Sequence, residues 1–246
     1  MGELSGRIHS FESFGGVDGK GIRYVIFLQG CSGGCVFCHN ADTWDMEGGT
    51  EFTVSEVMKK VESCKPYLTL SNGGVTVSGG EPLNQSMFVA ELFRRCREIG
   101  INTAIDTSAY GTMSDIDLVS ENLDLFLISV KHTTDVGHRQ LTAFERRVAW
   151  DNIRHIDTKG IPMWIRFVVI PGLTDSEGVL RGLGEFVGSL SGVRRVELIP
   201  YHTLGAHKWR ELGMENRLEG VPPAGDEHMD RAANIMRQYF SNVIVL

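Results

Sequence analysis

The sequence lacks a long apolar run, a basic block and a disulfide framework. No stretch approaches the roughly 18 consecutive apolar residues of a membrane-spanning helix, and no signal peptide is apparent. Lys and Arg number 24 against 31 Asp and Glu, a net charge of −7, which argues against a nucleic-acid partner. Three of the five cysteines lie close together, so the cysteine count predicts a reducing cytoplasm. Cys64 and Cys96 lie in helical patterns and are interpreted as structural.

The length and composition are those of one α/β domain. With 246 residues, 42% of them hydrophobic, the chain can build one sizeable core. Its 29 glycines gather at the ends of predicted strands, where a barrel of β/α units carries its functional loops. We expect a single domain over 1–246, with an N-terminal strand and loop at 1–21, a core at 22–202 and a C-terminal extension at 203–246.

Apolar periodicity predicts six strand–helix units, an arrangement typical of an open, partial (β/α)6 TIM-like barrel. A short alternating segment, Arg7 to Glu12, precedes them as a strand that covers an edge, and a capping box, Thr53 to Glu56, opens the first helix. Core strands are expected near 22–28, 74–78, 101–107, 124–131, 161–171 and 193–200, a terminal strand at 243–246, and helices near 53–63, 85–99, 113–121, 138–158, 176–190 and 227–240.

The chain is organised around Cys31-Ser-Gly-Gly-Cys35-Val-Phe-Cys38, three cysteines in a C-x3-C-x2-C spacing. Thiolates hold iron–sulfur clusters, and three of them leave one iron of a four-iron cluster without a protein ligand. An open metal position is a place for chemistry. Two other interpretations stay open at this point: a closed Cys3His zinc site that includes His39, and three unligated core cysteines.

Polar residues stand at the C-terminal ends of several predicted strands, which is the rim where barrels carry their chemistry. Gly79-Gly80-Glu81 follows one strand; its carboxylate can accept from an ammonium group, although an ordinary turn explains the same residues. Asp106 lies at the end of the next strand. Lys131 ends an inward-facing row, which indicates either ligand binding or a lysine that reaches the surface.

Three further residues each allow two interpretations. Arg166 interrupts a strongly apolar strand, so its guanidinium requires an anion, either a ligand carboxylate or an internal salt bridge. His202 follows the next strand and is either a ligand-binding group or a hydrogen-bonded loop histidine. Asp18 lies in the glycine-rich loop 13–21, which either grips a partner or forms a simple turn.

These residues carry a family resemblance. Cys31 to Cys38 resembles the cluster motif of the radical S-adenosylmethionine (SAM) enzymes. The wider pattern, which adds Asp18-Gly-Lys-Gly21, Arg23 and His39-Asn40, resembles the glycyl-radical-enzyme activating enzymes, and among these the pyruvate formate-lyase activators most. The resemblance runs nearly end to end and adds no second cysteine cluster. It implies one [4Fe-4S] cluster, held by the three motif cysteines as metal ligands and catalytic residues, with SAM at the open iron.

The resemblance also implies roles for the other candidate residues. The implied SAM-binding set is Phe37, His39, Gly79, Gly80, Glu81, Asp106, Lys131, Arg166 and His202. Within it, Gly79-Gly80-Glu81 would receive the amino group of SAM, Phe37 would border its adenine, and Lys131 and His202 are counted as catalytic. Asp18 and Arg23 would lie on the substrate side, where the loop holds the partner's glycine loop.

The implied reaction is the reductive cleavage of SAM to a 5′-deoxyadenosyl radical. This radical takes a hydrogen from a backbone glycine of a glycyl radical enzyme, with pyruvate formate-lyase as the first choice of partner. A flavodoxin or ferredoxin would supply the electron, and the chain is expected to be a monomer. One alternative is a radical SAM enzyme for a small molecule, similar to 7-carboxy-7-deazaguanine synthase, against which the Asp18 loop and Cys38-His39-Asn40 argue. The other is a non-catalytic cluster-binding or zinc-binding protein.

The sequence departs from the pattern of the activators at three places. Lys20 stands where proline is usual in the Asp18 loop, and Ser108-Ala109 stands where Asn-Gly is usual. Ser129-Val130-Lys131 replaces Asp-Leu-Lys, whose aspartate helps to bind a monovalent cation near SAM. Ser129 carries no charge, so Asp106 is the remaining carboxylate for such a cation.

We therefore predict a weaker potassium dependence than in relatives that carry both carboxylates. With one carboxylate instead of two, less charge attracts the cation, so its occupancy should affect the reaction less. The measurement is the rate of SAM cleavage as potassium replaces a large organic cation at constant ionic strength. A rate that rises steeply with potassium would contradict this prediction.

Overall fold

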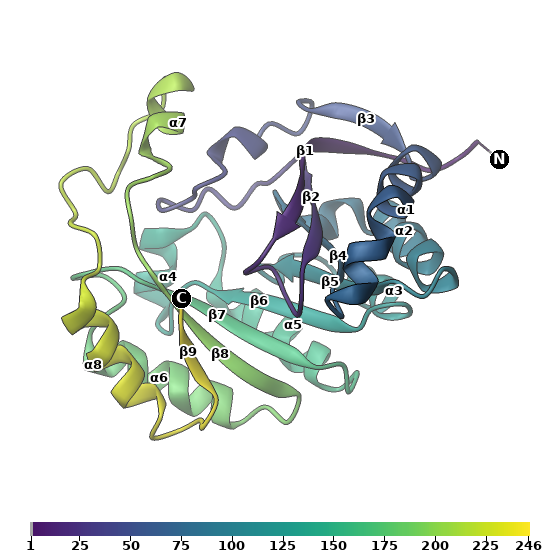
Figure 1. Cartoon of the computed structure of the whole chain (residues 1–246). Coiled ribbons are helices and arrows are strands. Elements are labelled where there is room, and N and C mark those ends of the chain that lie inside the picture. The colour runs from purple at the N-terminus through teal and green to yellow at the C-terminus, as the bar shows by residue number, and fades with distance from the viewer. Residues whose placement is uncertain (1) are drawn as a thin grey trace. The chain divides into compact units, whose positions relative to one another are not determined.

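Parallel strands joined by helices dominate the fold (Figure 1). The computed structural model describes residues 2–246, and its strands are β1 (Ser5–Gly15), β2 (Arg23–Leu28), β3 (Thr50–Thr53), β4 (Gly74–Gly79), β5 (Asn102–Thr107), β6 (Leu125–Val130), β7 (Met163–Val169), β8 (Val193–Pro200) and β9 (Val243–Val245). Their order is β3-β1-β2-β4-β5-β6-β7-β8-β9. The pairs β2–β4, β4–β5, β7–β8 and β8–β9 are parallel, whereas β1 is antiparallel to β2 and β3.

This strand order confirms the predicted fold class, an open α/β sheet of the partial-barrel type. Among residues 2–246, β3 and β9 stand at opposite ends of the order, so the sheet does not close on itself. β1 covers β2 as expected, but β3 lies outside β1, and the sequence pattern does not predict it. None of the helices in this part of the chain has the length and apolar character needed to cross a membrane.

The chain forms two compact units, which are described separately. The first comprises residues 2–32 and 43–127, and the second comprises residues 33–42 and 128–246. Strand β6 contributes its first half to the first unit and its second half to the second. A short 3-10 helix, η1 (Ala41–Thr43), lies where the chain returns to the first unit.

The first unit places its helices against the strands β2, β4 and β5. The helices are α1 (Val54–Leu70), α2 (Ser86–Glu98) and α3 (Met113–Ser120), with a 3-10 helix, η2 (Pro82–Gln85), before α2. In Figure 1 the three α-helices lie together beside β4 and β5. The strands are buried along almost their whole length. After Arg23, β2 is a continuous apolar run, whereas β4 and β5 also bury threonine and serine side chains.

Helix α1 shows how burial extends an element beyond its sequence signal. The predicted capping box is present: Thr53 accepts from the Glu56 N–H, and the Glu56 carboxylate accepts from the Thr53 N–H at 2.8 Å. The helix was expected to end near 63, but it continues through Pro66 to Leu70. Proline removes one helical hydrogen bond. The buried stripe nevertheless continues from Cys64 to Leu68, four residues apart, and its burial outweighs that loss.

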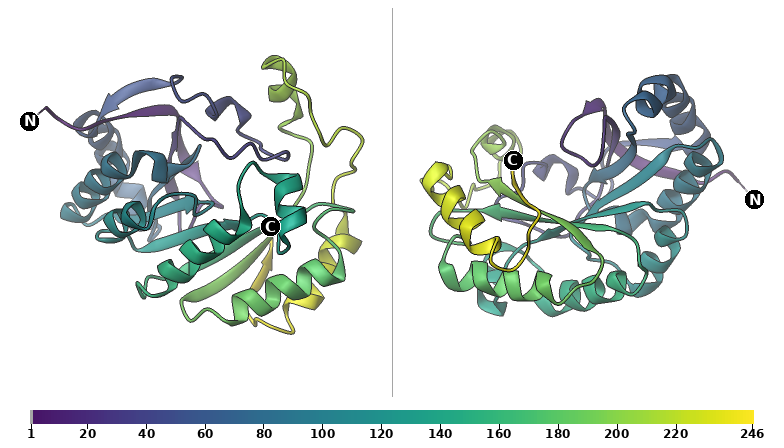
Figure 2. Two further views of the ribbon diagram at one scale, coloured as in Figure 1. Left: turned by 180° about the vertical axis from the view of Figure 1, so that it is seen from behind. Right: turned by 60° about the horizontal axis from the view of Figure 1, so that its bottom comes forward.

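The second unit packs helices against β7 and β8. Its helices are α4 (Asp135–Leu141), α5 (Arg146–Asp157), α6 (Glu177–Gly188), α7 (Ala206–Glu211) and α8 (Asp226–Met236). Figure 2 shows α6 and α8 side by side, with α8 also against β8 and β9. The side chains of Ile165, Phe167, Val196 and Leu198 form the strand layer of its core and are fully buried.

One expectation for the second unit is wrong, and one of its helices was not predicted. The single helix predicted at 138–158 is two helices, α4 and α5. Thr142 takes an extended conformation at the break, its hydroxyl accepts from the Phe144 N–H, and the Ala143 N–H donates to Gly33 O at 2.9 Å. No helix was predicted in the polar stretch after His202, and the structure has helix α7 there.

Gly184, on the buried face of α6, tests this packing. A Cβ at this position would lie 2.3 Å from the Tyr239 ring, so we expect Gly184→Ala to lower the free energy of unfolding by about 1–3 kcal/mol. Gly178→Ala on the same helix is the matched control, because a Cβ there meets nothing within 4 Å. This control should be neutral or stabilising by up to about 1 kcal/mol. Urea denaturation measures both, and equal stabilities for the two variants would contradict the packing.

Candidate active site

The turn after β4 is pressed against the end of β2. Leu28 and Gly79 are register partners in these parallel strands, and the Gly80 N–H donates to Leu28 O at 2.8 Å. A Cβ on Gly79 would lie 2.5 Å from the Leu28 backbone, and one on Gly80 would lie 2.3 Å from Gly30 O. Gly79 also has φ +101°. Both positions therefore require glycine, and the turn lies directly beside the residue that precedes Cys31.

Glu81 completes this turn as a buried carboxylate that is 3% exposed. Its oxygens accept from the Thr107 hydroxyl, from the Ser108 N–H at 3.0 Å and from the Leu83 N–H at 3.2 Å. The Glu81 N–H donates to Gly30 O at 3.0 Å. Buried carboxylates require such donors. Glu81 thus joins the ends of β2, β4 and β5 within the first unit.

Asp106 and Asp18 also belong to the first unit. Asp106 lies near the end of β5, half-buried, and accepts from the Ser78 hydroxyl at 3.2 Å. Asp18 lies in the loop between β1 and β2, where its carbonyl accepts from the Thr76 hydroxyl at 2.7 Å. The predicted loop therefore exists, and this hydrogen bond attaches it to β4.

Arg23 lies behind this loop. Its side chain is fully buried and donates to the Thr76 hydroxyl at 2.8 Å and to the Asn102 side chain at 2.8 Å. A third contact, to Lys20 O at 3.4 Å, supports the loop itself. Burial lowers the pKa of Arg23 to about 10, with the Asp124 and Asp18 carboxylates opposing that shift. The structure thus places Arg23 as an internal support of the Asp18 loop.

The three motif cysteines are half-buried, and none of them is in a disulfide. Cys31 belongs to the first unit, where its N–H donates to Trp44 O at 3.3 Å. Cys35 and Cys38 belong to the second unit, and the Cys38 N–H donates to Cys35 O at 3.0 Å. Cysteine thiolates are the ligands that hold iron–sulfur clusters, so these residues fit that group chemically. Across residues 2–246, no three His, Cys, Asp or Glu side chains are gathered in metal-binding geometry.

In the second unit, Lys131 and Phe37 lie close together. The Lys131 ammonium is 5.6 Å from the centroid of the Phe37 ring, within the range of a cation–π contact. Phe37 packs against a buried hydrophobic cluster, which consists of Val36, Leu141, Ile170, Tyr201 and Leu218. The structure thus brings together two predicted SAM-binding residues.

His39 and His202 form a second pair. Their rings are stacked with centroids 4.2 Å apart, and His39 Nε2 lies 3.2 Å from His202 O. A carbonyl can only accept, so the hydrogen of His39 is on Nε2. Burial, and then repulsion from His202, lowers the pKa of His39, which keeps the ring neutral at pH 7. His202 Nδ1 accepts from the Leu204 N–H at 3.4 Å, so neutral His202 carries its hydrogen on Nε2 as a donor.

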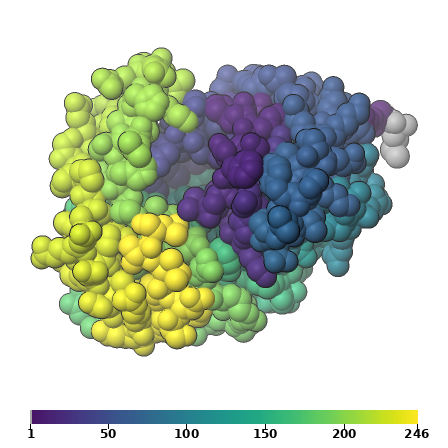
Figure 3. All heavy atoms as spheres, in the orientation of Figure 1, coloured from purple at the N-terminus to yellow at the C-terminus, as the bar shows by residue number. Residues whose placement is uncertain are grey.

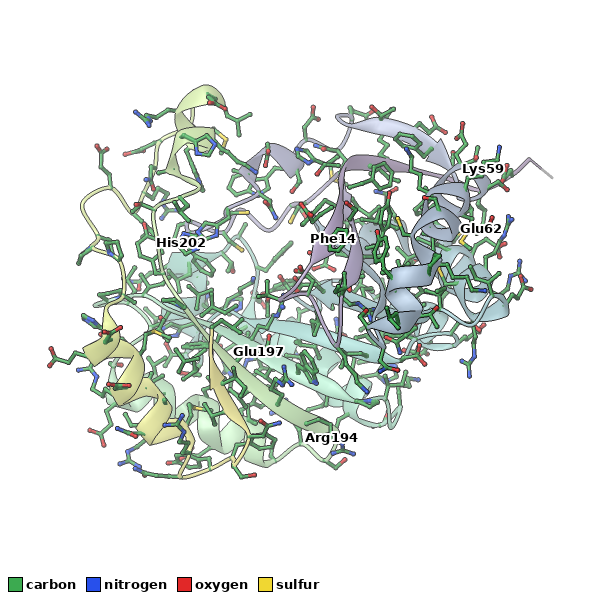
Figure 4. The ribbon with its side chains drawn as sticks, in the orientation of Figure 1. Phe14, Lys59, Glu62, Arg194, Glu197 and His202 are labelled. Atoms are coloured by element: carbon green, nitrogen blue, oxygen red, sulfur yellow. The ribbon has the colours of Figure 1, made fainter. Side chains whose placement is uncertain are left out.

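Arg166 forms the internal salt bridge that was one of its two interpretations. Its Nε lies 3.0 Å from Glu197, and the two side chains are 8% and 2% exposed. Arg195 contacts the other Glu197 oxygen at 3.3 Å and lies over the Trp164 ring at 3.7 Å. Register explains the cluster, because Trp164 pairs with Arg195 and Arg166 with Glu197 between β7 and β8. Figure 4 shows Glu197 on β8, between Arg194 near its start and His202 past its end.

Several residues that shape the site were not singled out from the sequence. Thr107 and Ser108 hold Glu81, and Glu197 holds Arg166. A carboxylate in the middle of an apolar strand was a usable signal for Glu197, because it matches Arg166 on the neighbouring strand. Trp209, an isolated aromatic residue in a polar stretch, was a second unused signal.

The family model described as "Radical SAM superfamily" matches residues 25–180. The crystal structure of a radical SAM methyltransferase from Sphaerobacter thermophilus superposes with a TM-score of 0.67 at 18% identity, covering 94% of this chain and 70% of that one. At this identity the likeness is one of fold alone. Together, the open sheet, the cysteine motif and the family match define the class of radical SAM proteins.

Two curated relatives narrow that class. The pyruvate formate-lyase 1-activating enzyme of Escherichia coli (strain K12) is 42% identical over 241 residues, covering 97% of this chain and 98% of the relative. The pyruvate formate-lyase-activating enzyme of Clostridium pasteurianum is 41% identical over 235 residues, covering 96% and 98%. The chain therefore belongs to the pyruvate formate-lyase activating enzymes of the radical SAM superfamily. Membership implies a [4Fe-4S] cluster and SAM as cofactors.

The Arg166–Glu197 pair gives a stability prediction. Arg166→Met leaves the buried Glu197 carboxylate with Arg195 alone, so we expect the free energy of unfolding to fall by about 3 kcal/mol. The double variant Arg166→Met/Glu197→Met removes the uncompensated charge and should recover most of that loss. Arg194→Met is the control, because Arg194 is exposed on β8, the strand that carries Glu197. It should change the free energy of unfolding by less than about 0.5 kcal/mol. Urea unfolding measures all three, and a single variant as stable as the control would refute the buried pair.

Proposed function

We propose that this chain activates a glycyl radical enzyme, most specifically pyruvate formate-lyase, by cleaving SAM reductively and removing a hydrogen from a backbone glycine of that partner. The observation that carries the proposal is the end-to-end similarity to an activating enzyme, 42% over 97% of the chain. The matched region includes the cysteine motif, the Gly79-Gly80-Glu81 turn and the Asp18 loop. A small-molecule radical SAM enzyme and a zinc-binding protein explain that combination less well.

The three motif cysteines would hold the cluster, and when bound, the cluster and SAM would supply the electron and the hydrogen-abstracting species. The chain's own residues would hold SAM in place. Gly79 and Gly80 let the turn pack directly against the backbone of Leu28 and Gly30, and Glu81, anchored by three donors, keeps the turn rigid. The role of Glu81 is then both to shape the turn and to add negative charge beside an ammonium group.

The family resemblance assigns further SAM-binding roles to residues of the second unit. Lys131 carries a positive charge for a carboxylate, and Phe37 beside it offers an apolar face for a purine. His202 presents Nε2–H as a donor, and His39 behind it keeps that ring in place by stacking. Arg166, whose Nε pairs with Glu197, would contribute its positive charge.

The substrate side is assigned to the loop around Asp18. Its tip is exposed, and Phe14, labelled in Figure 4, precedes it. The Phe14 ring stacks on Tyr67 with ring centroids 4.8 Å apart. A backbone glycine must reach the site in an extended segment. The exposed loop is fixed by hydrogen bonds from Arg23 and Thr76, so it offers that segment a rigid surface to bind. Arg23 therefore acts on the substrate by positioning Asp18.

Four finer points complete the proposal. The electron donor is a flavodoxin or a ferredoxin, because the five cysteines leave no second set of cluster ligands. A monovalent cation, if one is bound, lies near Asp106 and is held weakly because Ser129 is neutral. The working form is a monomer, and the working compartment is the cytoplasm, where cysteines stay reduced.

The decisive experiment is anaerobic. The chain is reconstituted with iron and sulfide, reduced, and mixed with SAM and pyruvate formate-lyase, and the EPR spectrum is recorded together with 5′-deoxyadenosine formation. We expect a glycyl radical doublet and a matching amount of 5′-deoxyadenosine. Cys38→Ala should abolish both, because one cluster ligand is lost, whereas Cys64→Ala, a cysteine outside the motif, should keep both.

The other outcomes separate the alternatives. 5′-Deoxyadenosine without the doublet would contradict pyruvate formate-lyase as the partner and leave another glycyl radical enzyme or a small molecule as the substrate. A reconstituted and reduced chain that forms neither product would contradict the activase altogether and favour the non-catalytic protein.

A further inference from the structure

Helix α7 holds the end of the cysteine motif, although it stands far from the motif in the sequence. It is short and lies in an otherwise polar segment of the second unit (Figure 3, light green). Half of its residues are exposed, but Trp209 is only 5% exposed. The indole Nε1–H of Trp209 donates to Cys38 O at 3.0 Å.

The residue after Cys38 is held by the segment that leads into α7. His39 donates Nε2–H to His202 O at 3.2 Å and stacks on the His202 ring. Gly205, the residue before α7, is buried against His39: a Cβ there would lie 3.0 Å from His39 Cα. The two backbones therefore approach as closely as the absence of a side chain allows.

An ion pair fixes the next few residues. Lys208 Nζ lies 2.9 Å from Asp42 and 3.5 Å from the Asn40 side-chain oxygen. The two charged side chains are 26% and 25% exposed, so the pair is partly shielded from solvent. Such a pair contributes little on its own, but it acts in the same place as the Trp209 and His39 contacts.

The other end of the loop has different supports. The Val36 N–H donates to Leu141 O at 3.0 Å, and the Ala143 N–H donates to Gly33 O at 2.9 Å. These contacts come from the end of α4 and the segment after it, and they hold residues before Cys38. The loop 33–42 thus has two supports, and the α7 support is the one at Cys38.

We propose that α7 is the positioning element of Cys38, with Trp209 as its main contact and Lys208 and Gly205 as secondary ones. None of these residues touches a cofactor in this role; they act by fixing the backbone that carries the Cys38 thiol. The inference rests on the proposed function only where it assigns Cys38 as a cluster ligand. Its physical content, that Cys38 is held by α7, is independent of that assignment.

The test compares two tryptophan variants of the full-length chain. Trp209→Phe removes the N–H donor to Cys38 and keeps an aromatic ring. Trp150→Phe is the matched control, because the Trp150 Nε1 is buried and has no hydrogen-bond partner among the described residues. Both variants lose the same atoms, so a difference between them measures the bond to Cys38.

Two readouts are taken from each variant. In the cluster-free chain, the rate at which iodoacetamide alkylates Cys38 is measured by mass spectrometry, with Cys31 as the internal reference. We expect Trp209→Phe to raise the alkylation rate of Cys38 roughly fivefold relative to that of Cys31, because the net free energy of one hydrogen bond corresponds to about that factor. Trp150→Phe should leave the alkylation rate unchanged. In the reconstituted holoenzyme, Trp209→Phe should release iron to a chelator faster by a similar factor and shift the g-values of the reduced cluster.

Equal Cys38 alkylation in the two variants would overturn the inference, whatever the cluster does. A wild-type chain that retains no iron would contradict the proposed function instead, and the alkylation comparison would still be valid. If Trp209→Phe does not fold, Lys208→Met and Lys208→Arg replace it. Lys208→Met should raise Cys38 alkylation about twofold, and Lys208→Arg, which can keep the pair with Asp42, should restore the wild-type rate. Identical rates in these two variants would also overturn the inference.

Discussion

The structure depends on hydrogen bonds to the backbone N–H and C=O groups of a segment that has almost no secondary structure of its own. Between β2 and η1, residues 29–40, the chain makes neither helix nor strand, so its polar backbone groups need partners elsewhere. In the first unit the Gly30 N–H donates to Thr43 O at 2.7 Å, and in the second the Val36 N–H donates to Leu141 O. Each such bond is worth only about 1 kcal/mol. Their number, rather than any single one, gives the cysteine loop its shape.

At the strand ends of the first unit, strand register fixes the positions of the site residues. Leu28 and Gly79 are paired in parallel strands, so the Gly-Gly-Glu turn necessarily falls beside the start of the cysteine motif. Glu81 then connects this turn to β5 by accepting a hydrogen bond from the Thr107 hydroxyl. A carboxylate with three donors is expensive to move, because any displacement leaves a buried charge without partners. The turn therefore offers a ligand a surface that is already in place.

Much of this arrangement could be predicted from local patterns. The periodic apolar runs located the core strands, and the Thr53 capping box located the start of α1, because these signals come from neighbouring residues. The break at Thr142 could not be predicted, since it depends on the Ala143 N–H reaching Gly33, more than one hundred positions away. The choice between the two interpretations of Arg166 likewise required the register that places Glu197 opposite it. Contacts of long range are absent from a local pattern, and these were the features that the sequence left open.

The bond between Trp209 and Cys38 spans 171 positions of the chain. A ribosome releases the cysteines early and Trp209 only after most of the protein has been made. Until then the loop that carries Cys38 has its α4 support but not its α7 support, and its last thiol is free to move. Delivery of iron and sulfide during synthesis would therefore meet an incompletely ordered loop, which favours metal insertion into the finished chain over insertion into the nascent one.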